Sequence, residues 1–169
     1  MTYELIASQT LGSDAASVTF DGIPQTYDDL VVIVSARSDR SGQISDDLYM
    51  TFNSSASGYS TRGLRGNGAS ATSDTYAGIT TSVGRLEINA STSTNSTFSS
   101  IEIYIPNYAG PTAKSISASS LWETNATGAQ MYAIAASWSG TAAINSIGFD
   151  PLGNFVSGSS FQIFGISNS

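Results

Sequence analysis

The sequence predicts an all-β protein, an antiparallel β-sandwich whose strands we expect to form a jelly roll. Apolar residues recur at every second position or in short β-branched runs, which is the period of strands and not of helices. Glycine, proline and asparagine turns interrupt these runs at intervals of about 10–15 residues, as in sandwiches and barrels. The whole chain, 1–169, is expected to be a single domain with eight core strands and one or two accessory ones. An immunoglobulin-like sandwich is the second choice, because such domains are usually nearer about 100 residues.

The first half of the chain contains five predicted strands. The run of apolar residues 30–34 is typical of a strand that is buried on both faces. The polar segments 37–47 and 67–75 are rich in glycine, serine and aspartate or asparagine and are predicted to be loops. The predicted strands are residues 3–7, 17–20, 30–36, 48–52 and 59–66.

The second half repeats the pattern. In 100–105 the three isoleucines Ile101, Ile103 and Ile105 share one face, and Pro106 ends the strand because proline cannot donate to a ladder. The alanine-rich segment 126–136 is the one candidate helix, but it contains glycine and ends in a strand-like alternation. The predicted strands are residues 79–83, 85–89, 100–105, 114–122, 131–138, 144–149 and 161–166.

Missing residue types exclude much chemistry. The chain has no cysteine and no histidine, so it has no thiolate nucleophile, no Ser-His-Asp triad and no imidazole or thiolate metal ligand. Six basic residues against thirteen acidic ones, a net charge of −7, argue against nucleic acid as a partner. We therefore expect no enzyme activity, no cofactor and no metal.

The sequence also argues against a membrane partner. The longest apolar run, 30–34, is far shorter than the roughly 18 residues of a membrane span. The first residues lack the basic start and apolar segment of a signal peptide. We expect the protein to be made and assembled in a cytoplasm.

Two acidic patterns suggest chemistry that the sequence does not favour. The aspartates at 28–29 and 46–47, with Asp39 nearby, could line a Ca²⁺ loop, but they lack the EF-hand spacing and we favour solvated loop carboxylates. Glu87 and Glu102 could face each other on adjacent strands as a glycosidase pair. Alternation equally makes each of them the outward residue of a half-buried strand, which is the interpretation we favour.

Aromatic and basic residues near loops are the candidate contact residues. Tyr59, Arg62, Arg65 and Tyr108 are our candidates for contacts with a ligand or an interface, because tyrosine combines a rigid apolar area with a polar tip. Packing of these tyrosines onto the end of the sandwich is the alternative. Serine and threonine replace the lysine and glutamate of ordinary surfaces, and their short side chains lose little rotamer entropy when another protein covers them. Such a surface suits stable assemblies.

Four segments of the chain resemble small β-rich virion proteins of tailed phages, especially aquatic phages and cyanophages. The segments are SVTFDGIPQTYDDL (17–30), SAR (35–37), IEIYIPNYAG (101–110) and GNFVSGSSF (153–161). The resemblance covers nearly the whole chain and implies a structural protein of the virion, with no catalytic motif. Because no long fibrous stalk is present, we expect a capsid decoration or cement protein on the outside of the head.

The implied partners follow from that role. We expect the major capsid protein or other virion proteins as partners, and a homo-oligomer, a trimer, as the functional unit. The alternative is a tail-fibre module that binds a receptor or a carbohydrate, with a glycan of the host surface as its ligand.

Overall fold

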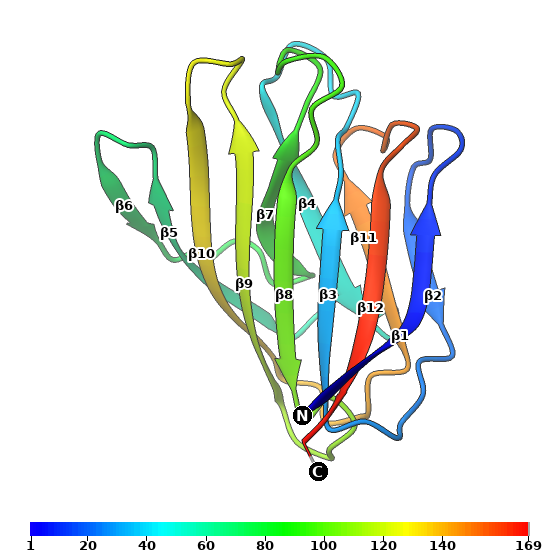
Figure 1. Cartoon of the computed structure of the whole chain (residues 1–169). Helices are drawn as coiled ribbons and strands as arrows, with labels where there is room; N and C mark the ends of the chain where they lie inside the picture. Colours follow the sequence, from blue (N-terminus) through cyan, green and yellow to red (C-terminus); the bar gives the residue numbers. More distant parts are fainter. Residues whose placement is uncertain (169) are drawn as a thin grey trace.

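The computed structural model describes residues 1–168, which form twelve β-strands in two sheets and contain no α-helix (Figure 1). Every strand pairing is antiparallel, so the predicted antiparallel β-sandwich is confirmed. The strands are β1 (Thr2–Thr10), β2 (Val18–Asp21), β3 (Asp29–Ser35), β4 (Ser45–Phe52), β5 (Tyr59–Gly66), β6 (Ala71–Asp74), β7 (Val83–Asn89), β8 (Ser100–Pro106), β9 (Lys114–Glu123), β10 (Ala129–Trp138), β11 (Ser146–Pro151) and β12 (Ser160–Ser167).

The two sheets differ in size. The larger has eight strands in the order β1-β12-β3-β8-β9-β10-β5-β6, and the smaller has four in the order β2-β11-β4-β7. In Figure 1 the larger sheet lies in front of the smaller one, and the hairpin β5–β6 extends to one side. Since β7, at the edge of the smaller sheet, packs against β9, β10 and β5, the smaller sheet covers only part of the larger one.

The order of the strands is the basis for interpreting the fold as a jelly roll. We set aside β5, β6, β9 and β10 and number the remaining eight strands 1 to 8 along the chain. Their order is then 1-8-3-6 in the larger sheet and 2-7-4-5 in the smaller one. The chain then changes sheet at every connection except the one from β4 to β7. We interpret this order as that of a jelly roll with two hairpins added to the larger sheet. The added strands number four, and not the one or two expected from the sequence.

A single hydrophobic core lies between the sheets. Its largest fully buried side chains include Phe52, Phe149 and Phe161, and the two tryptophans, Trp122 and Trp138, are 4% and 5% exposed. Inward and outward residues alternate along the strands as the sequence predicts. Among residues 1–168 no helix is long and apolar enough to cross a lipid bilayer.

Two of the predicted elements are wrong. Residues 79–82 are not a strand: the N–H of Ile79 donates to the carbonyl of Tyr76 (2.9 Å) and closes a turn, and β7 begins only at Val83. The predicted loop 67–75 contains β6, a short and fully exposed strand that pairs with β5. Because β6 buries no side chain, its sequence has no apolar alternation by which to find it. The other predicted strands each overlap a strand of the structure.

Candidate docking face

The outward-facing side of the eight-stranded sheet, here called the broad face, is the candidate functional surface. The pairing registers align its outward side chains in rows that cross the sheet. One row is Leu5, Phe164, Val31, Tyr104, Ser117, Ala135 and Arg62, and the next is Gln162, Ile33, Glu102, Ser119, Ala133 and Leu64. Few of these side chains are charged.

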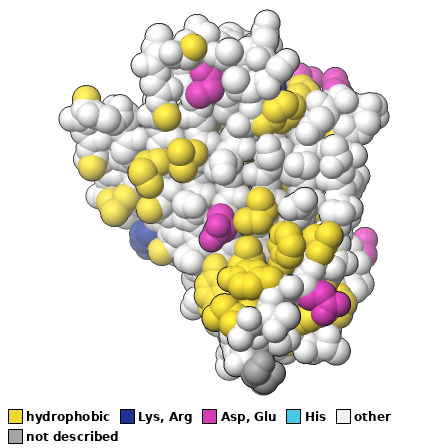
Figure 2. Space-filling view, viewed as in Figure 1, with side chains coloured by type: hydrophobic (Ala, Val, Ile, Leu, Met, Phe, Trp, Pro, Cys, Tyr) yellow, Lys and Arg dark blue, Asp and Glu magenta, His cyan; other side chains and the backbone are white. Residues whose placement is uncertain are grey.

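The broad face exposes large apolar side chains. Among residues 1–168, seven large hydrophobic side chains are exposed, and five of them lie on this face: Tyr3, Leu5, Leu64, Leu121 and Met131. Figure 2 views this face and shows hydrophobic side chains gathered over it, with few charged ones between them. Since scattered apolar residues are normal but a gathered set marks a contact surface, this face is a candidate for docking.

The broad face is also hollowed. One hollow, of about 570 Å³, lies over β9 and β10 beside the hairpin β5–β6, where Ser117, Ala133 and Ala135 are small. A second, of about 210 Å³, lies among Tyr3, Ile33 and neighbouring side chains. The broad face therefore combines protruding apolar side chains with recesses floored by alanine and serine.

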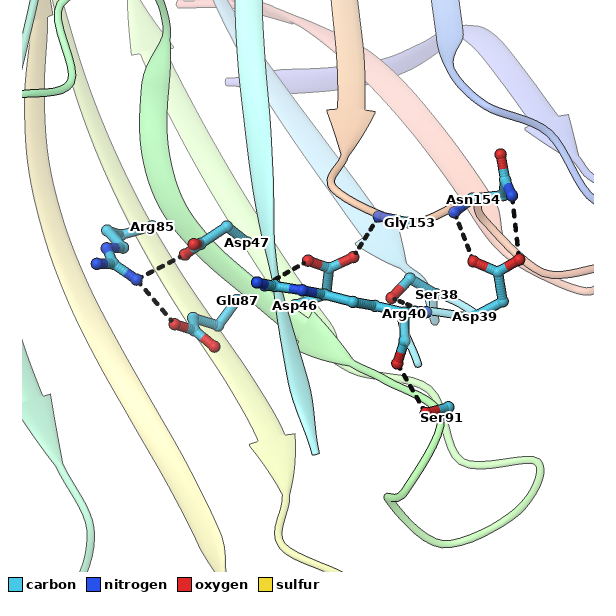
Figure 3. A network of polar contacts seen from close by, with 10 residues as sticks. All are labelled: Ser38, Asp39, Arg40, Asp46, Asp47, Arg85, Glu87, Ser91, Gly153 and Asn154. Carbon is cyan, nitrogen blue, oxygen red and sulfur yellow. Dashed lines mark hydrogen bonds and ion pairs between the residues drawn. The ribbon is translucent and has the colours of Figure 1, made fainter. Parts of the chain in front are cut away.

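The outward side of the four-stranded sheet is different, because charged side chains lie on it. Nη1 of Arg85 lies 2.9 Å from Oδ1 of Asp47 and 3.7 Å from Oε1 of Glu87 (Figure 3). Burial acts to lower the pKa of Arg85, but the adjacent carboxylates outweigh it and the pKa is raised. Burial raises the pKa of Glu87. This side of the sandwich is polar and internally paired, in contrast to the broad face.

The two glutamates considered as a glycosidase pair do not face each other. Glu87 lies on β7 in the smaller sheet, and Glu102 lies on β8 in the larger one, on the broad face. The disfavoured possibility that they face each other on adjacent strands is not realised, because the chain changes sheet between β7 and β8. A pair of carboxyls across one cleft, which glycoside hydrolysis needs, is not formed by these residues.

The aspartates considered as Ca²⁺ ligands bind protein groups. Asp46 is buried and binds Nη1 of Arg40 (3.0 Å) and the N–H of Gly153 (2.9 Å), and Asp39 accepts from the backbone N–H of Asn154 (2.7 Å), as Figure 3 shows. Within the described residues, 1–168, no group of three or more acidic side chains is placed to hold a metal ion. Asp39 and Asp46 thus tie loops together at one end of the sandwich. The favoured interpretation of solvated loop carboxylates is wrong for Asp46, which is buried within β4.

Two of the four candidate contact residues are buried. Tyr59 is 3% exposed and its hydroxyl accepts from the N–H of Phe52 (2.8 Å). Tyr108 is fully buried and its hydroxyl donates to the carbonyl of Pro24. The prediction of exposed loop contacts is therefore wrong for both tyrosines. Each ring is covered by the core while its hydroxyl finds a backbone partner, which is the usual arrangement of a buried tyrosine.

The two candidate arginines lie on the same strand but on opposite faces. Arg62 is exposed at the end of a broad-face row, and its guanidinium donates to the carbonyls of Thr75 (2.7 Å) and Thr61 (2.8 Å). Arg65 is in register with the buried Tyr132 and points the other way. The structure does not bring the four candidates together.

No family model, no curated protein and no solved structure matches this chain.

Proposed function

We propose that this chain is a structural protein of a tailed-phage virion that decorates the outside of the head through non-covalent assembly. One observation carries the proposal: the two outer faces of the sandwich differ, one being apolar and hollowed and the other charged and internally paired. A protein that is covered on one side and exposed on the other needs this asymmetry. The resemblance to phage virion proteins supports the same role.

The mechanism is mass action. A protein that binds only the assembled shell stabilises the shell relative to its separated subunits. The small residues of β9 and β10, such as Ser117 and Ala133, lose little side-chain entropy when they are covered. The net charge of −7 fits a position on the outer surface better than one beside the packaged DNA.

Particles that lack the protein test this proposal. Purified protein added to such particles should bind to the head, appear there by electron microscopy, and raise the temperature at which the particles lose their DNA. Ala133→Arg on the broad face should abolish binding, whereas Thr19→Arg on the outward side of β2 should leave it intact, because both positions are exposed. Particles that neither bind the protein nor differ in heat resistance contradict the proposal.

The tail-fibre module is the alternative, and the same images separate the two. Tyr59 and Tyr108 are buried, so neither ring can contact a glycan. For this reason we prefer head decoration. Gold labelling at the tail, or binding to host cells that is lost on substitution of the exposed Arg62, would replace our proposal with the alternative.

A further inference from the structure

The broad face has two unlike halves. On β3 and β8 the outward side chains of the two central rows include Val31, Ile33 and Tyr104. In the same rows, β9 and β10 carry serines and alanines, among them Ser117 and Ala133. The half on β3 and β8 therefore has the larger side chains, although Val31 is only 8% exposed and lines the smaller hollow of about 210 Å³. The half on β9 and β10 contains the hollow of about 570 Å³.

The next row reverses this relation. Leu121 on β9 and Met131 on β10 are large side chains that are 44% and 45% exposed. Their neighbour in the same row on β8 is Ser100. On β3 the row continues with Ser35, which lies two residues after Ile33. On the four central strands β3, β8, β9 and β10, large outward side chains on one pair of strands therefore lie beside small ones on the other pair. Beyond them, Arg62 and Leu64 on β5 are large and exposed.

We infer that a second copy of this chain covers the broad face, around a two-fold axis that runs parallel to the strands between β8 and β9. The inferred oligomer is a dimer and replaces the trimer expected from the sequence. This axis places β8 opposite β9 of the second copy and β3 opposite β10 of the second copy. Because it preserves the position along the strands, each row faces the same row of the second copy. Between the copies, Val31 meets Ala135, Ile33 meets Ala133 and Tyr104 meets Ser117. In the third row, Ser100 meets Leu121 and Ser35 meets Met131.

Packing discriminates this axis from the other two-fold axis in the plane of the face. An axis that runs across the strands would set Val31 on Ile33 and Ala133 on Ala135, so that one half collides and the other stays hollow. Sheets packed face to face lie about 10 Å apart and about 30° from parallel. The pairs on β3, β8, β9 and β10 lie nearest the axis, where this rotation displaces them least.

The charges of the face fit the same arrangement. Glu102 meets Ser119 of the second copy, whose hydroxyl can donate to the carboxylate. Arg62 meets Phe164, and a guanidinium stacks favourably on an aromatic ring. Neither charge meets a like charge, which would oppose association.

The area is sufficient for a stable pair. Apart from the short β6, the strands of the larger sheet have at least seven residues each, and seven such strands about 4.8 Å apart cover roughly 800 Å² in projection. A standard interface between two proteins buries about 800 Å² on each partner. The broad face can therefore supply a complete interface by itself.

The isolated chain tests the pairing. Sedimentation and light scattering should give a dimer at micromolar concentration. Ala133→Arg should give a folded monomer, and the matched Thr19→Arg should stay a dimer, with circular dichroism to check that both are folded. A monomeric wild type, a trimer, or a dimer that Thr19→Arg disrupts and Ala133→Arg does not, overturns the inference.

A disulfide between copies provides the second measurement, because the natural chain has no cysteine. In the double variant Ile33→Cys with Ala133→Cys, the two cysteines of one chain are separated by three inter-strand spacings, about 14 Å. This distance is too long for a disulfide within the chain. Oxidation should give a covalent dimer of the double variant and none of either single variant. Monomers from all three variants overturn the proposed axis.

The inference rests on the proposed function in taking the broad face as an assembly surface. One face cannot contact a head and a second copy at once, so the pair is the state of the free chain, and it opens when the face docks on a head. The tests of the pairing use no particles. A chain that is monomeric in solution and still decorates heads refutes the two-fold pairing alone. A dimer that never binds particles refutes head decoration alone.

Discussion

Arg37 and Glu123 bind the same loop, between β7 and β8, from two elements far apart in the chain. The guanidinium of Arg37 donates to the carbonyls of Thr94 (2.8 Å) and Thr97 (3.2 Å) and to Oγ of Ser93 (2.8 Å). The carboxylate of Glu123 accepts from the hydroxyls of Thr94 (3.0 Å) and Thr97 (3.2 Å). The loop is thereby attached both to the segment after β3 and to the end of β9.

Arg37→Met should destabilise the fold strongly. Arg37 is 7% exposed, and its removal leaves several buried acceptors unpaired at about 1–3 kcal/mol for each group that finds no water. We expect the free energy of unfolding to fall by about 3 kcal/mol, measured by urea denaturation with tryptophan fluorescence. The exposed Arg62→Met is the control, and its effect should stay within about 0.5 kcal/mol. Equal effects of the two substitutions would refute this role of Arg37.

Glu123 makes stability depend on pH. Burial acts to raise the pKa of Glu123, but the N–H groups of Ala126 and Thr94 and the threonine hydroxyls outweigh it and hold the pKa below its usual range. A carboxyl with a lowered pKa in the folded state stabilises the protein above its unfolded pKa, and this contribution is lost as the pH falls through the folded pKa.

The variant Glu123→Gln isolates this contribution. At pH 7 it should be less stable than the wild type, and the difference should shrink as the pH falls below about 4.5, the range in which a free glutamate takes up its proton. Urea denaturation midpoints of both proteins, measured at steps from about pH 3 to about pH 7, provide the test. A difference that is constant across the range, or that grows at low pH, contradicts the predicted direction.

Tyr59 should act through stability and not through ligand contact. Its hydroxyl accepts from the N–H of Phe52 in the core, and its ring stacks on Trp138 at 6.1 Å. Tyr59→Phe should lower the free energy of unfolding by about 1–2 kcal/mol and leave binding to particles or cells unchanged once the protein is folded. The exposed Tyr3→Phe should change stability little. Specific loss of binding in a Tyr59→Phe protein of normal stability would restore the idea of an exposed contact.

Gly165, on β12 of the larger sheet, provides a test of packing. A Cβ at this position would lie 2.3 Å from the ring of Tyr27, so the ring must move. Gly165→Ala should cost about 1–3 kcal/mol, as overpacking does, and lower the melting temperature. Gly12→Ala, where the added Cβ meets nothing within 4 Å, is the control and should leave the melting temperature near that of the wild type.

The sequence predicts the class of fold because burial on one side of a strand leaves a period of two. Ile101, Ile103 and Ile105 are all buried and face the core, and Glu102 and Tyr104 face outward, as the alternation predicts. The neighbours of a strand in its sheet are set by contacts between distant residues. The separation of Glu87 and Glu102 into different sheets therefore could not be predicted from alternation alone.

The broad face could be predicted from the sequence only in part. Serines at 115, 117 and 119 and alanines at 133 and 135 alternate with buried residues. Small residues at outward positions of neighbouring strands are typical of close approach by another layer. What the sequence alone could not indicate is that these strands are adjacent, and that the apolar side chains of β1, β3 and β12 continue the same surface.

The accessibility of two engineered cysteines tests most directly that the broad face is the covered side. Ser117→Cys places a thiol on the broad face and Thr19→Cys places one on the outward side of the smaller sheet, both at exposed positions. In dilute, dissociated protein a maleimide should label both. In assembled particles it should label the cysteine at 19 and spare the one at 117. Labelling at 117 with protection at 19 would contradict the account.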